Sequence, residues 1–263
     1  MESSLASTEA VGFLFALGLS CARILGFLAI FPLTSAQFFP PVARNGLAIV
    51  IGGFVMPQVF PVAMSLKIEP ALFVLLGFKE VAIGTLFGFA LGTLVWTFEA
   101  VGSFVEFQSG SANSQVFDPL SGSEAGLLSR FFVQLAILLF LALGGLELFL
   151  RVLMESYSLW PADQWLPQFS RIAMEVGRAV SLNFWSMLFK YTISVMVCVY
   201  LVDIFFGITG RYAPQLNLFQ LSLPVKSAVI LLVLVAIVPS MAVGFEGSLL
   251  EIVQILNSAL AVR

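Results

Sequence analysis

Apolar residues gather in six long stretches of the chain, at residues 11–31, 46–64, 71–98, 127–150, 184–208 and 227–245. Most of these stretches reach the ~20 residues that a helix needs to cross a bilayer core. The second stretch is weaker, because Pro57 and Pro61 would kink or end a helix there. Between the first two stretches, Pro32, Pro40 and Pro41 indicate a turn. The pattern therefore predicts an all-α, polytopic membrane protein of about six hydrophobic helices.

The overall composition supports the same class of protein. Of the 263 residues, 60% are hydrophobic and only 10% are charged, whereas soluble domains average about 45–50% apolar and about 25% charged residues. No change of composition typical of a linker divides the chain, so we expect a single domain over residues 1–263. The formal net charge of −3 argues against nucleic acid as a partner, because nucleic-acid binding requires a basic patch.

Residue types that carry catalysis or hold metals are scarce. The chain has no histidine, which excludes Ser-His and Cys-His nucleophile pairs and the usual zinc sites. Cys21 and Cys198 lie far apart within apolar stretches, where we expect them to pack as small hydrophobic residues. Asp118, Asp163 and Asp203 lack the paired motifs of intramembrane aspartyl proteases, and no motif indicates Ser-Lys chemistry. We therefore expect an absence of catalytic residues, cofactors and metal sites.

Several charged side chains lie inside the apolar stretches, and five of them need an explanation: Arg23, Lys79, Glu80, Lys190 and Asp203. A charge at the bilayer centre costs ~2.5–3.5 kcal/mol on insertion scales. Arg23, Lys190 and Asp203 have no opposite charge three or four residues away, and Lys79 and Glu80, as neighbours on a helix, should not face each other. These charges therefore need partners elsewhere, either across this fold or on another subunit. In contrast, an i, i+4 ladder at a helix end satisfies its own charges: Glu147, Arg151 and Glu155.

Glycines recur every four residues in the third apolar stretch. Gly84, Gly88 and Gly92 fall on one helical face, where the absence of side chains allows a second helix to approach closely. We therefore expect tight helix packing along this face.

The loop charges do not indicate a membrane orientation. With the N-terminus outside, one side collects three basic residues and the other collects five: Arg44, Arg211 and Lys226 against Lys67, Arg151, Arg171, Arg178 and Arg263. Such a weak bias is expected if the helices are not ordinary lipid-facing spans.

A polar segment interrupts the apolar chain at residues 109–126, which read SGSANSQVFDPLSGSEAG. Residues 99–126 carry four acidic residues and no basic residue: Glu99, Glu106, Asp118 and Glu124. Irregular backbone is not tolerated in lipid, so the segment must lie in water or in a protein-lined cavity. It is either an ordinary solvated loop or a movable obstruction in a channel.

This segment and three other motifs resemble the export-gate family of type III secretion, which includes the virulence-system SctT proteins (YscT, SpaR and EscT types) and the flagellar FliR proteins. The segment GSANSQVFDPLSGSE follows the helix KEVAIGTLFGFALGTLVWTFEAVG. The other stretches are RILGFLAIFPLTSAQFFPPVARNGLA, LMESYSLWP and RYAPQLNLFQLSLPVKSA. Four motifs in the same order make the resemblance specific over nearly the whole chain.

The resemblance implies a place in a helical assembly with several copies of SctR-type and SctS-type subunits, and with an SctU-type switch protein at the base. Such an assembly forms the entrance of the secretion channel for unfolded protein substrates and starts the growth of the inner rod or needle. The family lies in the bacterial inner membrane, with bent helical hairpins raised partly toward the periplasm. In that setting the five lone charges become contacts with other subunits or line a polar cavity.

The family's mid-chain loop projects into the closed pore as part of a plug. On this chain the resemblance assigns the plug to the following residues: Ser109, Gly110, Ser111, Asn113, Phe117, Asp118, Pro119, Ser121 and Gly122. Ser109 stands where many virulence-type relatives carry an arginine, which leaves the anchoring of this loop open. Gly145-Leu146 stands where flagellar relatives often show Gly-His, which favours the virulence branch.

A small-solute secondary transporter is the alternative function, because lone charges and broken helices also mark the binding sites of such proteins. A transporter of this class predicts an internal repeat between the halves of the chain. Neither the hydropathy pattern nor the motifs show such a repeat.

Overall fold

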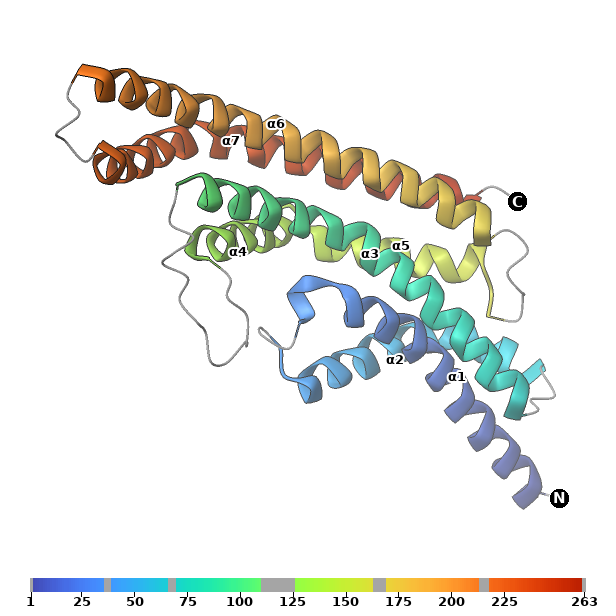
Figure 1. The fold of residues 1–263 in the computed structure, drawn as a ribbon. Helices are drawn as coiled ribbons and strands as arrows, with labels where there is room; N and C mark the ends of the chain where they lie inside the picture. The colour runs from blue at the N-terminus through green and yellow to red at the C-terminus, as the bar shows by residue number, and fades with distance from the viewer. Residues whose placement is uncertain are drawn as a thin grey trace. The chain divides into compact units, whose positions relative to one another are not determined.

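The computed structural model describes residues 2–35, 39–65, 70–109, 126–162, 169–212 and 218–261, and every regular element in these ranges is helical (Figure 1). The elements are α1 (Glu2–Ile30), the 3-10 turn η1 (Pro32–Thr34), α2 (Pro41–Ser65), α3 (Pro70–Ser109), α4 (Leu127–Ala142), α5 (Gly145–Leu159), α6 (Phe169–Tyr212) and α7 (Leu218–Ala261). Among the described residues, five helices are long and apolar enough to cross a membrane, and α4 with α5 makes a sixth span if the two helices count as one. The predicted class, an all-α polytopic membrane protein, is confirmed.

Helix α3 continues beyond the apolar stretch that predicted it. The expectation that Glu99 and Glu106 belong to an irregular segment is wrong, because α3 ends only at Ser109. Val101 and Val105, each 1% exposed, continue the helical spacing of buried residues and give the last turns an apolar face to pack. The remaining residues of that segment, 110–125, lie outside the described residues.

Prolines do not end the helices in which they occur. Helix α2 continues through Pro57 and Pro61, and α7 continues through Pro224 and Pro239. A proline removes one backbone hydrogen bond from a helix, a loss that apolar helices tolerate where local adjustments satisfy the freed carbonyl. Of the two alternatives predicted for α2, a kink or an end at the prolines, the end is therefore wrong.

The fourth apolar stretch is not one helix but two, α4 and α5, separated by Leu143 and Gly144. Gly144 has φ 72° and ψ 24°, the left-handed conformation. Glycine adopts this conformation without the steric cost that a side chain would bring, and it commonly follows the last residue of a helix. The break in the stretch therefore has a local cause.

Helices α6 and α7 are much longer than their predicted apolar cores. Each contains 44 residues, which at 1.5 Å per residue gives a length of about 66 Å. The hydrocarbon core of a bilayer is only about 30 Å thick. A helix of this length that stands upright in a bilayer therefore extends well outside the hydrocarbon core.

The chain forms two compact units, each built from separate segments. Unit 1 contains Met1–Thr93, Gly144–Val180 and Leu250–Arg263, and unit 2 contains Leu94–Leu143 and Ser181–Leu249. Helices α3, α6 and α7 each contribute to both units, so neither unit is one continuous piece of sequence. The single domain over residues 1–263 stays a prediction.

Within unit 1, α1 approaches the first half of α3 backbone to backbone. A Cβ atom at Gly84 would collide with the carbonyl oxygen of Arg23, and a Cβ atom at Gly88 would lie 2.7 Å from the carbonyl oxygen of Phe27. Gly92, one turn further along α3, is buried. The glycine spacing of α3 thus permits the close helix contact that such spacing predicts.

Aromatic stacking adds a second contact to α1 in unit 1. The ring of Phe27 stacks on that of Phe149 in α5, with 3.6 Å between centroids, and on that of Phe31, with 4.9 Å between centroids. All three side chains are at most 3% exposed. Helix α1 is therefore held by both α3 and α5.

Within unit 2, α6 and α7 run antiparallel as a long hairpin (Figure 1). The hydroxyl of Tyr191 in α6 donates to the carbonyl oxygen of Ser240 in α7 at 3.0 Å. The ring of Phe98 in α3 meets those of Phe132 in α4 and Phe245 in α7 edge-on, with centroids 6.5 Å and 5.4 Å away. The aromatic contacts join α3, α4 and α7, and the hydrogen bond of Tyr191 joins α6 to α7.

We predict that Gly88→Ala destabilises the protein by about 1–3 kcal/mol, because the added carbon must displace the backbone of α1. Gly77→Ala, on the same helix but with no atom within 4 Å of the added carbon, should be neutral or stabilising by up to about 1 kcal/mol through helix propensity. The midpoint of thermal unfolding in mild detergent measures both effects. Equal midpoints for the two variants would contradict the packing role of Gly88.

Candidate functional site

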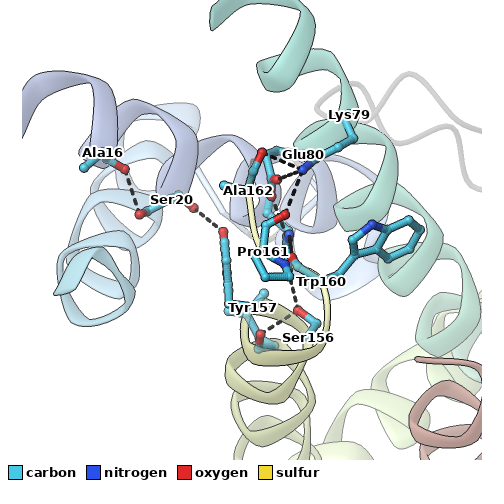
Figure 2. A network of polar contacts seen from close by, with 11 residues as sticks. Ala16, Ser20, Lys79, Glu80, Ser156, Tyr157, Trp160, Pro161 and Ala162 are labelled. Atoms are coloured by element: carbon cyan, nitrogen blue, oxygen red, sulfur yellow. Dashed lines mark hydrogen bonds and ion pairs between the residues drawn. The ribbon is translucent and has the colours of Figure 1, made fainter. Parts of the chain in front are cut away.

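A network of buried polar contacts joins three parts of unit 1 (Figure 2). Arg23 of α1 is 0% exposed, and each of its guanidinium nitrogens has an acceptor. Nε donates to Glu80 Oε2 at 2.6 Å, Nη1 to Ser156 Oγ at 2.7 Å and Nη2 to the carbonyl oxygen of Trp160 at 3.2 Å. The guanidinium carbon lies 3.7 Å from the ring centroid of Tyr157, which is cation–π geometry. Arg23 thus connects α1 to α3 and to the end of α5.

Lys79 holds the same carboxylate from a second direction. Its Nζ lies 2.9 Å from Glu80 Oε1, in an ion pair that lacks hydrogen-bond geometry at that oxygen. The same nitrogen donates to the carbonyl oxygens of Ala162 at 2.9 Å and Pro161 at 3.3 Å. Lys79 is 3% exposed and Glu80 is 0% exposed. The carboxylate of Glu80 is therefore buried between two cations.

The carbonyl acceptors of this network follow from the way α5 ends. The last carbonyl groups of a helix have no partner within it and carry partial negative charge, so nearby cations are favourable. Helix α5 ends at Leu159, and Pro161 has no N–H group to continue the helical hydrogen bonding. The carbonyl oxygens of Trp160, Pro161 and Ala162 instead accept from Arg23 and Lys79.

Tyr157 extends the network back to α1. Its hydroxyl donates to the carbonyl oxygen of Ser20 at 3.1 Å, and the hydroxyl of Ser20 donates to the carbonyl oxygen of Ala16 at 2.8 Å (Figure 2). The hydroxyl of Ser156 likewise donates to the carbonyl oxygen of Leu153 at 2.6 Å. The network is therefore a chain of satisfied groups that bridges α1 and α5.

The buried contacts of Arg23, Lys79 and Glu80 form a structural clamp that connects α1, α3 and the end of α5. It holds two cations and one carboxylate, and the carbonyl oxygens at the end of α5 offset the remaining positive charge. A buried ion pair adds little net stability over an apolar pair, but removal of one partner leaves an uncompensated buried charge. Lys79 is engaged by a carboxylate and two carbonyl groups, so it does not have the form of a catalytic base.

Three of the five lone charges predicted to need distant partners thus find them within unit 1. The expectation that Lys79 and Glu80 do not face each other is wrong, because the flexible lysine stem brings its Nζ to the neighbouring carboxylate. In unit 2, Asp203 of α6 pairs with Lys226 of α7 at 2.5 Å. Contact of these four residues with another subunit stays a prediction.

Lys190 differs from the other four charges. It is exposed on α6, and within the described part of the chain it makes no ion pair. Its Nζ lies 5.3 Å from the ring centroid of Tyr191, a weak interaction at an exposed position.

The predicted plug falls almost wholly outside the described residues. Of the plug residues, Gly110, Ser111, Asn113, Phe117, Asp118, Pro119, Ser121 and Gly122 lie outside them. Ser109, the last residue of α3, is buried and donates to the carbonyl oxygen of Glu106 at 2.7 Å. Gly126 precedes α4, and the carboxylate of Glu106 occupies the space that a side chain at this position would fill. The two ends of the loop are therefore anchored near one another in unit 2.

Cys21 and Cys198 are both half-buried and free. The thiol of Cys21 donates to the carbonyl oxygen of Ala48 at 3.6 Å, a contact between α1 and α2. In the ladder near the start of α5, Arg151 pairs with Glu147 at 3.1 Å. Across the described residues, no three cysteine or acidic side chains gather as a metal site would require.

The sequence analysis missed the roles of Ser156, Tyr157 and Trp160. The available signal was the motif LMESYSLWP, which contains all three and which the family resemblance singled out. Two further motifs, RILGFLAIF and KEVAIG, supply Arg23 and the Lys79-Glu80 pair. Three motifs that are far apart in sequence thus meet in one network.

We predict that Glu80→Gln lowers the free energy of unfolding by about 3–5 kcal/mol, because it leaves Arg23 and Lys79 buried without a carboxylate. Glu147→Gln is the matched control, since its ion pair with Arg151 is exposed, with side chains 77% and 63% accessible. That change should cost less than about 1 kcal/mol. Thermal unfolding in mild detergent compares the two, and a loss for Glu80→Gln no larger than for the control would refute the clamp.

Comparison with known proteins places the chain in a family. Residues 14–252 match the family described as bacterial export proteins, family 1. The surface presentation of antigens protein SpaR of Shigella sonnei is 31% identical over 210 residues, which cover 75% of this chain and 78% of that protein. The flagellar biosynthetic protein FliR of Bacillus subtilis (strain 168) is 29% identical over 215 residues, or 81% and 82% of the two chains. The Yop proteins translocation protein T of Yersinia pestis is 26% identical over 226 residues, again 81% and 82%.

The similar proteins carry both flagellar and surface-presentation names at comparable identity, so the virulence branch stays a prediction. The family description, the names of the relatives and the apolar helices together support a membrane protein with a role in export. The chain belongs to the bacterial export proteins, family 1, and five of its described helices are long and apolar enough to cross a membrane.

Proposed function

We propose that this chain is an export-gate subunit, which forms the entrance channel for protein export across the bacterial inner membrane together with SctR-type and SctS-type subunits. An SctU-type switch protein contacts the base of the gate, and the inner rod or needle subunits extend from it. The cargo is unfolded secreted protein. The observation that carries this proposal is the length of exposed apolar surface on α6.

Exposed apolar side chains occur along nearly the whole of α6, from Met174 at 71% to Tyr212 at 85% exposure. In its most apolar 18-residue window only 11% of the residues are buried, against 67% for α3. The candidate span Ala173–Tyr212 has 40 residues, or about 60 Å of helix. This surface must be covered by lipid, by protein or by both.

A bilayer alone cannot cover the exposed apolar side chains along the whole length of α6. To place about 60 Å of helix within a core of about 30 Å, the helix would have to tilt by about 60°, whereas membrane helices tilt by about 0–40°. Part of the exposed apolar face therefore needs cover from other protein subunits. This requirement supports assembly into a larger complex. The family resemblance implies that the part of the chain outside the bilayer lies toward the periplasm.

We assign the role of a pore plug to residues 109–126. Support comes from the small residues that make up most of the segment's sequence and from its one aromatic residue, Phe117, beside Asp118 and Pro119. The described ends of the segment, Ser109 and Gly126, both lie against Glu106 in unit 2. In this role the small residues fill a narrow pore, and the Phe117 ring supplies the bulk that closes it.

The small-solute transporter is not proposed. Three of the charges that would have formed its binding site are buried and engaged with one another and with α5, and a fourth is paired with Lys226. We propose no catalytic role either, because the family is described as bacterial export proteins and one relative is named a secretion system apparatus protein.

We predict that deletion of residues 110–122 leaves the complex assembled but leaky, because the obstruction is lost while the anchored ends remain. Dye uptake or conductance in resting cells that express the chain with its partner subunits should rise several-fold over wild type. Secretion should persist, since an unobstructed channel still passes a chain.

Two controls complete this test. A Gly/Ser segment of equal length in place of residues 110–122 should also leak, because it lacks the Phe117 ring. The deletion variant without partner subunits should not leak, because it forms no channel. If the assembled deletion complex shows no more dye uptake or conductance than wild type, the segment is an ordinary solvated loop and the plug assignment is wrong.

A further inference from the structure

Between Arg178 and Asp203, the exposed face of α6 carries a single charge, Lys190, which makes no ion pair with the described residues. Arg23, Lys79, Glu80 and Asp203 all lie in ion pairs, whereas Lys190 does not. Lys190 lies 17 residues after Ala173 and 22 before Tyr212, the ends of the candidate span. A cation among apolar residues on a membrane-length helix is expensive unless an anion neutralises it.

Exposed apolar residues flank Lys190 on both sides. Trp185 is 52%, Phe189 54%, Ile193 53% and Val197 53% exposed, and they recur at the four-residue spacing of one helical face. Whatever covers this face must therefore be apolar over several turns and negative at one point. A helix with a single carboxylate among apolar residues has this pattern.

Small side chains stand one turn before and one turn after Lys190. Ser186 and Ser194 are both exposed, and the hydroxyl of Ser194 donates to the carbonyl oxygen of Lys190 at 2.8 Å. Small residues at such positions let the backbone of a second helix approach closely. A short aspartate or glutamate on that helix then reaches the ammonium group.

The neighbouring face of α6 is fixed, so Lys190 is presented from a rigid surface. Met187, Leu188 and Tyr191 are at most 5% exposed. The hydroxyl of Tyr191 donates to the carbonyl oxygen of Ser240 in α7, and it occupies the space beside Gly244 that a side chain there would fill. The hairpin therefore packs through one face of α6 and leaves the Lys190 face available.

We propose that the α6 face around Ser186, Lys190 and Ser194 is the docking site for a membrane helix of another export-apparatus subunit, which carries an aspartate or glutamate opposite Lys190. This inference rests on the proposed function and specifies the chemistry of one partner. It separates Lys190 from the other four charges, whose partners lie within the chain.

The test uses the full chain, tagged and co-expressed with the other subunits of its export apparatus, and measures the partner recovered per chain in mild detergent. Lys190→Glu should lower recovery at least about tenfold, because like charges oppose each other across the contact. Lys190→Leu should lower it several-fold, because the partner carboxylate is left without a cation. Lys190→Arg should stay within about twofold of wild type. Arg151→Leu, at an exposed ladder with its own partner, should have no effect.

The leucine variant distinguishes the docking helix from lipid. If phosphate headgroups or acyl chains cover this face, Lys190→Leu removes an insertion cost, and recovery stays level or rises, which overturns the proposal. A photo-crosslinking residue at Ser194 identifies the occupant without relying on the charge variants. A product with a different subunit supports the proposal, whereas a product of twice the chain mass or no protein product overturns it.

The same experiment separates this inference from the proposed function. If wild type recovers no other subunit, both fail. If wild type recovers its partners and the Lys190→Leu and Lys190→Glu variants recover them equally well, the proposed function stands and the docking site does not.

Discussion

The ion pair between Arg23 and Glu80 is the interaction on which the rest of unit 1 depends. Both side chains are fully buried, in a protein with few charges and no histidine. In such surroundings neither charge is tolerable alone, and their cost is offset only if every donor finds an acceptor. Arg23 therefore draws Ser156 and the end of α5 into contact with α1 and α3.

The ion pair and the glycine face of α3 act at the same contact. Glu80, Gly84 and Gly88 follow one another at four-residue spacing. Arg23 binds Glu80 through its side chain and lies against Gly84 through its carbonyl oxygen, and Phe27 lies against Gly88 one turn later. The glycines bring the two backbones close, which gives the carboxylate its short reach to the guanidinium group. The clamp and the packing are thus parts of one helix–helix contact.

Unit 2 is organised by different forces. Its described helices meet through aromatic edges and one half-exposed ion pair, Asp203–Lys226, and α6 keeps a long apolar face exposed. A helix about twice as long as the bilayer core is thick cannot bury that face in lipid alone. The same face carries Lys190, which makes no ion pair with the described residues. We therefore expect the partner that covers this face to carry a negative charge opposite Lys190.

Much of this organisation was readable in the sequence. The lengths of the apolar stretches set the membrane class, the lack of histidine excluded several active sites, and the spacing of Gly84, Gly88 and Gly92 indicated close packing, because each of these is a local or compositional property. The tertiary structure alone decided how far α3 continues and which partners neutralise the charges. Arg23, Glu80 and Ser156 are separated by 57 and 76 positions in the chain. Sequence spacing predicts contacts only within a helix, so the choice between a partner across the fold and one on another subunit had to come from the packing of helices, which buried Arg23 against Glu80 and left Lys190 exposed.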